Sequence, residues 1–153
     1  MSDKKLNEFE KKYRITINDK HITSGEQTES ETELMGNLSV QKNGYEIRYM
    51  EHTGDMAGTT TKIFVDEPNK VRLTRGGLFQ TDLILELKKR HNCCYETPYG
   101  TLIMGVYAHR IDSNMNPDGG DLEFSYSLDV GGGEVLENEL KISVRKIDNV
   151  ANS

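Results

Sequence analysis

A strict alternation of apolar and polar residues over 121–130 (DLEFSYSLDV) constrains the fold more than any other feature of the sequence. Every second side chain is apolar, and the side chains between them are charged or small and polar. A period of two places all the apolar side chains on one face of an extended strand. Shorter stretches at 13–17, 83–87 and 140–144 repeat the pattern. The alternation therefore predicts antiparallel strands that each bury one face.

Turn-forming residues divide the rest of the chain into further short strands. Asn43-Gly44 and Pro98-Tyr99-Gly100 are typical of tight hairpin turns, because these residues adopt turn backbone angles at little cost. We expect additional strands at 28–41, 44–52, 59–66, 70–75, 78–88, 91–97 and 100–111. Closure of such a meander removes its exposed edges. The sequence thus predicts an all-β fold, a single antiparallel up-and-down β-barrel of about eight to ten strands.

The 153 residues predict one domain with a lean hydrophobic core, since 35% of them are hydrophobic and the mean hydropathy is -0.66. We assign 13–147 to the barrel, 1–12 to an N-terminal segment with a short helix, and 148–153 to a flexible tail. No apolar run approaches the roughly 20 residues of a membrane helix, so no membrane association is expected. The N-terminus has no apolar stretch typical of a secretory signal, which favours a cytoplasmic location.

The charge balance argues against a nucleic-acid partner. Nineteen Lys and Arg against 25 Asp and Glu give a net charge of -6, whereas binding to a phosphate backbone relies on clustered basic residues. Besides the N-terminus, the basic cluster is Lys88-Lys89-Arg90, which falls in a predicted turn. The two cysteines are adjacent and cannot form a disulfide framework, which suits a reducing compartment.

Four sets of residues, in order, suggest a family. They are Tyr49-Met-Glu51 with Thr53-Gly54 and Gly58, then Arg75-Gly76-Gly77, then Tyr95-Glu-Thr-Pro-Tyr-Gly100 with Gly105, and last Gly120-x-Leu122-x-x-x-Tyr126-x-Leu128. Together they resemble the YwiB-like family of uncharacterised bacterial proteins, which have a calycin-like (lipocalin-like) β-barrel. The resemblance covers roughly residues 13–145 and implies a cytoplasmic bacterial protein. It implies no activity, and Cys93-Cys94 departs from the family pattern.

The adjacent cysteines are the first candidate for chemistry. Neighbouring residues of a strand project to opposite faces, so Cys93 and Cys94 cannot both approach one metal ion. A structural zinc site needs about four ligands, and the histidines are scattered along the chain. A catalytic thiol requires an electropositive setting, whereas Glu96 lies nearby. We therefore predict no metal site and no catalytic residue, and interpret the cysteines as structural.

Two loop-like stretches resemble ion-binding motifs. Asp112, Asn114, Asn116, Asp118 and Glu123 have the spacing of a calcium loop, but proline occupies the position where that loop needs glycine. We interpret 112–118 as a long hairpin loop. Residues 54–58 begin and end with glycine, but they lack the lysine and the following helix of a phosphate-binding loop.

Two charged residues share the phase of apolar neighbours. Glu51 is in phase with Tyr49, and Arg75 follows Val71 and Leu73 at the same period of two. Buried charges are costly unless paired, so the two either pair with each other, sit at strand ends in water, or orient a polar ligand in an apolar cup. In the last case we expect Tyr49, Glu51, Arg75 and Tyr107 to line the ligand site.

The functional prediction is a non-enzymatic barrel that binds a small, partly apolar molecule in its interior, with no cofactor. One alternative is a filled barrel that contacts a protein partner, including a second copy as a homodimer. The other alternative is a small-molecule enzyme with Glu51 as acid or base. These three predictions differ in whether the barrel interior is open or filled.

Overall fold

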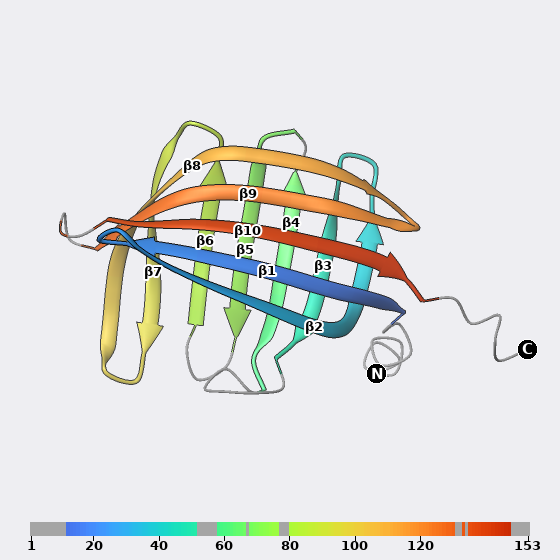
Figure 1. Cartoon of the computed structure of the whole chain (residues 1–153), viewed down its shortest axis with the longest axis horizontal. Helices are drawn as coiled ribbons and strands as arrows, with labels where there is room; N and C mark the ends of the chain where they lie inside the picture. Colours follow the sequence, from blue (N-terminus) through green and yellow to red (C-terminus); the bar gives the residue numbers. More distant parts are fainter. Residues whose placement is uncertain are drawn as a thin grey trace, which may run out of the picture.

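The chain forms a closed barrel of ten antiparallel strands in which each strand pairs with its neighbours in sequence and β1 closes on β10 (Figure 1). The computed structural model describes residues 12–51, 58–66, 68–76, 80–130, 133 and 135–147. The strands are β1 (Tyr13–Thr23), β2 (Glu26–Val40), β3 (Gly44–Met50), β4 (Thr60–Asp66), β5 (Lys70–Gly76), β6 (Gln80–Glu86), β7 (Arg90–Thr97), β8 (Gly100–Asn116), β9 (Gly119–Val130) and β10 (Val135–Lys146).

The barrel is flattened into two layers that cross each other. Figure 1 shows β1, β2, β8, β9 and β10 running across the near side, with β3 to β7 running steeply behind them. The predicted all-β barrel is confirmed, at the upper end of the expected strand number. The expected N-terminal helix and C-terminal tail fall on 1–11 and 148–153, which lie outside the described residues. Among the described residues, no helix is long and apolar enough to cross a membrane.

Alternation along the strands builds the core, as predicted from 121–130. Leu122 and Phe124 are 0% and 2% exposed, whereas Glu123 between them faces outward. The interior-facing side chains of the strands form one continuous hydrophobic cluster. The core therefore occupies the interior between the two layers, which favours the filled-barrel alternative over an empty cup.

One predicted loop is wrong. Residues 112–116 belong to β8, which continues to Asn116 and pairs with β9 as far as Gly119. Ser113 and Met115 lie opposite Leu122 and Gly120, so this stretch has the period of a strand. Its polar composition conceals this period, because the strand end is largely exposed. The hairpin turn is confined to 117–118.

Polarity changes along the inside of β3 to β6. In one cross-strand row, Ile47, Ile63 and Leu73 are directly opposite one another, and all three are buried. In the next row toward one barrel end, the paired residues are Tyr49, Thr61, Arg75 and Thr81. This end of the barrel therefore has a polar inner rim over an apolar core.

Candidate functional site

Arg75 is the charged member of the polar inner rim. Its Nε atom is buried and makes no hydrogen bond, and Arg75 forms no ion pair with any described carboxylate. Tyr49 and Thr61 beside it are 4% and 0% exposed. Arg75 as a whole is half-buried, and a partly desolvated cation without a counter-ion costs free energy on folding. Arg75 is therefore a candidate contact for an anionic group at this end of the barrel.

The charge of Arg75 affects the pKa values of two tyrosines. Burial raises the pKa of Tyr49, and the adjacent positive charge of Arg75 acts in the opposite direction. Burial also raises the pKa of Tyr126 to about 12, with Arg75 again lowering it and Asp19 raising it. The charge of Arg75 thus acts on phenol groups from both layers, in agreement with its place in the inner cross-strand row beside Thr61. Both phenols stay protonated at neutral pH and can donate hydrogen bonds.

A second group of polar side chains, on β1 and β10, lies at the same end of the barrel. His21 Nδ1 lies 2.5 Å from the Asn138 side-chain oxygen, and His21 Nε2 lies 3.1 Å from Asp19 Oδ1. Asn138 is 5% exposed and lies directly opposite Tyr126 in the β9–β10 pairing. The polar end therefore combines side chains from β1, β3, β4, β5, β6, β9 and β10.

A groove of about 630 Å³ runs over the outer face of β2 to β5 at this end of the barrel. Its lining residues are Met35, Gly36, Asn37, Arg48, Tyr49, Met50, Thr60, Lys62, Thr74, Arg75 and Gly76. The pairing register places Asn37, Arg48, Lys62 and Thr74 in one row across the four strands. Because Tyr49 and Arg75 also line the groove, it adjoins the polar inner rim.

The structure separates the four predicted site residues into two groups. Tyr49 and Arg75 lie together as expected. Glu51 is two residues after Tyr49 and half-buried, and its charge raises the pKa of Tyr49. Glu51 and Arg75 form no ion pair, so the alternative that they pair with each other is wrong. Tyr107 lies elsewhere, on the outer face of β8, where its ring centroid is 5.1 Å from that of His109.

A second groove, of about 640 Å³, crosses the outer faces of β1, β2, β8, β9 and β10. Two of its three cations form ion pairs. Lys20 lies 3.8 Å from Glu139 and 4.0 Å from Glu29, and Arg110 lies 2.5 Å from Glu123. These pairs neutralise Lys20 and Arg110 within the chain, and acidic side chains also line this groove, which distinguishes it from the groove over β2 to β5.

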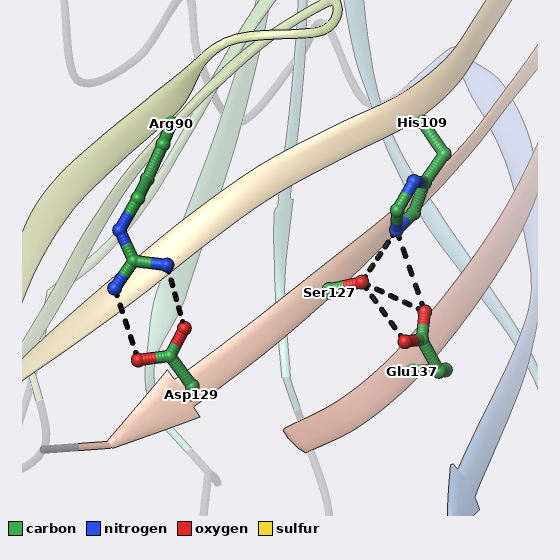
Figure 2. A network of polar contacts seen from close by, with 5 residues as sticks. All are labelled: Arg90, His109, Ser127, Asp129 and Glu137. Atoms are coloured by element: carbon green, nitrogen blue, oxygen red, sulfur yellow. Dashed lines mark hydrogen bonds and ion pairs between the residues drawn. The ribbon is translucent and has the colours of Figure 1, made fainter. Parts of the chain in front are cut away.

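A serine, a histidine and a glutamate meet on the outer surface, which the sequence order does not suggest (Figure 2). Ser127 Oγ donates to both Glu137 carboxylate oxygens at 2.9 Å, and His109 Nε2 contacts Ser127 Oγ and lies 3.5 Å from Glu137. In a catalytic triad, the serine and the carboxylate bind different ring nitrogens of the histidine. Here both contact the same nitrogen on an open sheet face, so the group links β8, β9 and β10 without the geometry of acyl transfer.

Arg90 makes the other contact drawn in Figure 2. Its two terminal nitrogens donate to Asp129 at 2.8 and 3.0 Å, from β7 across β8 to β9. The guanidinium passes over Gly105, where a Cβ atom would meet Arg90 Nη2 at 2.0 Å. This fork is a structural clamp across three strands.

The two cysteines lie on opposite faces of β7, as predicted. Cys93 is 4% exposed and Cys94 is exposed, and both are free. Burial raises the pKa of the Cys93 thiol, which keeps it protonated and unreactive at neutral pH. Among the described residues, no cluster of three or more His, Cys, Asp and Glu side chains is arranged to hold a metal ion.

Comparison with known proteins places this barrel in a family. The profile of the domain of unknown function DUF1934 matches residues 15–142. The chain belongs to the DUF1934 family. The crystal structure of the ywiB protein from Bacillus subtilis superposes with a TM-score of 0.79 at 18% sequence identity, covering 89% of this chain and 92% of the other. At this identity the likeness establishes the fold alone, and the family resemblance expected from the motifs is confirmed. No curated protein sequence matches the chain.

Proposed function

We propose that the protein is a non-enzymatic binder of a small, partly apolar molecule, which it holds in the groove over β2 to β5. The observation that carries this proposal is the groove of about 630 Å³ that Arg75 lines, a half-buried arginine with no ion-pair partner in the described chain. The site keeps Tyr49 and Arg75 from the sequence prediction. The proposed ligand position differs from the sequence prediction, because side chains of the core occupy the barrel interior. The ligand is instead placed on the surface at the polar end.

The groove offers both kinds of contact that such a ligand needs. Met35 and Met50 are 42% and 39% exposed, and methionine side chains adapt readily to apolar ligands. Thr60 and Thr74 add hydroxyl groups on neighbouring strands, with Lys62 directly opposite Thr74 and two residues from Thr60. Glu51 does not line the groove, which favours binding over acid–base catalysis at this site.

Ligand retention by the purified protein tests the proposal. Native mass spectrometry of freshly purified protein is expected to show a bound small molecule that is released on denaturation. The substitution Met50→Glu is expected to abolish retention, because it places a carboxylate in the apolar part of the groove lining. The matched control is Val135→Glu, an exposed apolar residue outside the groove, which should leave retention intact. Retention that is insensitive to Met50→Glu would contradict the proposal.

A second candidate function is contact with a protein partner through the β7–β8 hairpin. Tyr99, Leu102 and Ile103 are 95%, 46% and 62% exposed, which is unusual for large apolar residues so close together. The β8 pairing with β9 begins only at Met104, so the backbone before it has one paired edge in the described structure. Ile103→Lys is expected to abolish any self-association measured by light scattering, whereas it leaves binding in the groove unchanged.

The location and source of the protein are also proposals. Both cysteines are free, which supports a cytoplasmic, reducing compartment. The similarity to a Bacillus subtilis protein supports a bacterial source, and the flattened up-and-down barrel supports the comparison with calycins. Cell fractionation with an antibody against the chain tests the location, and recovery in the membrane or extracellular fraction would contradict it.

A further inference from the structure

We propose that the ligand of the β2–β5 groove is an anion, with a carboxylate or phosphate head group carried on an apolar chain. This inference rests on the proposed function and names the chemical class of its ligand. Three observations on the groove support it: the placement of its cations, the composition of its lining, and the position of its apolar side chains.

Two cations of the groove lie side by side on adjacent strands. Arg48 and Lys62 are directly opposite on β3 and β4, and both side chains are half-buried. Like charges in this position destabilise a sheet. Glu46 lies 3.2 Å from Arg48, but Lys62 forms no ion pair with any residue that the structure describes. An anion bound beside the two cations would supply the missing counter-charge.

The lining of the groove has a charge opposite to that of the whole chain. It contains Arg48, Lys62 and Arg75 and no Asp or Glu, although the protein carries a net charge of -6. The groove over β8 to β10, in contrast, is lined by acidic residues as well as by the cations Lys20, Arg110 and Lys141. A positive groove on an acidic protein attracts anions and disfavours cations and acidic surfaces.

The arrangement of the remaining side chains fits an anion with a tail. Thr60 and Thr74 flank Lys62 on β4 and β5, so hydroxyl donors lie beside the ammonium group. Met35 and Met50 supply the apolar part of the lining. A head group at Lys62 and a short alkyl chain along the methionines would use both parts of the groove.

Calorimetric titration with four probes of one chain length tests this inference. The probes are octanoate, octyl phosphate, octanol and octylammonium, and inorganic phosphate shows whether the head group alone suffices. Octanoate or octyl phosphate is expected to bind, and the tighter of the two identifies the head group. Lys62→Met should weaken that binding about tenfold, the effect of one charge-assisted hydrogen bond. Lys141→Met removes the same charge from the other groove and should leave the affinity unchanged.

The outcomes separate this inference from the proposed function. If octanol binds as tightly as octanoate and Lys62→Met has no effect, the groove binds a small molecule but the anionic class is wrong. If Lys62→Met and Lys141→Met weaken octanoate equally, binding follows net charge and the site assignment is wrong. If no probe binds and native mass spectrometry finds no retained molecule, both proposals fail. Thermal unfolding of each variant verifies that it is folded.

Discussion

At the scale of single residues, the buried phenol of Tyr126 predicts a loss of stability at alkaline pH. Its pKa is raised from 10.0 to about 12 by burial, so the folded state holds the phenol proton more tightly than the unfolded chain does. This stabilisation is complete below pH 10 and is lost as the pH rises through about 12. A shift of this size corresponds to roughly 2–3 kcal/mol. Tyr126→Phe should therefore flatten the decline in unfolding free energy between these pH values.

Urea unfolding at several pH values, together with phenolate absorbance, measures this effect. The wild-type protein should show a late step of phenolate absorbance near pH 12, after the exposed tyrosines have ionised, and Tyr126→Phe should reduce that late step. Tyr99→Phe removes the hydroxyl group of a side chain that is 95% exposed and should leave the late step intact. Equal pH slopes for wild type and Tyr126→Phe would show that the phenol does not govern alkaline stability.

Gly36 predicts a second effect at this scale, because a side chain there has no space. A Cβ atom would lie 2.4 Å from the Arg48 carbonyl oxygen and 2.5 Å from Ile15 Cδ1. Gly36→Ala should therefore lower the unfolding free energy by about 1–3 kcal/mol. Gly76 also lines the groove but has no atom within 4 Å of an added Cβ. Gly76→Ala is the matched control, and equal unfolding midpoints for the two variants would contradict this account.

The residues of the candidate site show how far sequence reasoning reaches. Tyr49 and Arg75 were predictable, because each lies in a strand whose apolar residues fix one inward phase. Tyr107 was not, because 100–111 has apolar residues at adjacent positions and no single phase. The pairing with β9 determines which residues of this stretch point inward. Val106 and Ala108 are both 0% exposed, and Tyr107 points outward. The opposition of Arg48 and Lys62 likewise depends on the register between two strands, which alternation within either strand does not specify.

At the scale of strands, the β6–β7 pair is the least extensive part of the barrel wall. The two strands share three residue pairs, from Gln80↔Glu96 to Asp82↔Cys94. Beyond them, the Ile84 amide donates to Cys93 Sγ at 3.4 Å. Regions with few backbone hydrogen bonds open at lower free energy than the rest of a fold. We therefore expect amides of β6 beyond Asp82 to exchange faster with solvent deuterium than those of β9 or β10.

Cysteine substitutions test the role of the β6–β7 pair. Cys93→Ala removes a buried side chain and the acceptor for Ile84, and should cost about 1–2 kcal/mol and accelerate exchange in β6. Cys94→Ala removes an exposed side chain on the opposite face and should change stability by less than about 0.5 kcal/mol. Equal effects of the two substitutions would contradict the assignment of Cys93 to the core.

At the scale of the whole molecule, closure of the barrel leaves one long stretch of strand edge. β2 pairs with β1 from Glu26 to Gly36, but its pairing with β3 begins only at Gly36. Exposed strand edges promote association between chains, and charged side chains oppose it. Glu29, Glu31 and Glu33 are exposed along this stretch. The acidic side chains of β2 therefore protect this unpaired strand edge.

Neutralising these carboxylates should convert the chain into a self-associating one. We expect the triple variant Glu29→Gln, Glu31→Gln, Glu33→Gln to form dimers or larger species by size-exclusion chromatography with light scattering, since the edge of β2 then lacks its repulsive charges. The control Asp66→Asn, Glu96→Gln, Asp118→Asn removes three exposed acidic charges elsewhere and has the same net charge. Because both variants differ from the wild type by the same charge, association of both would assign the effect to net charge, and association of the β2 variant alone would assign it to the strand edge.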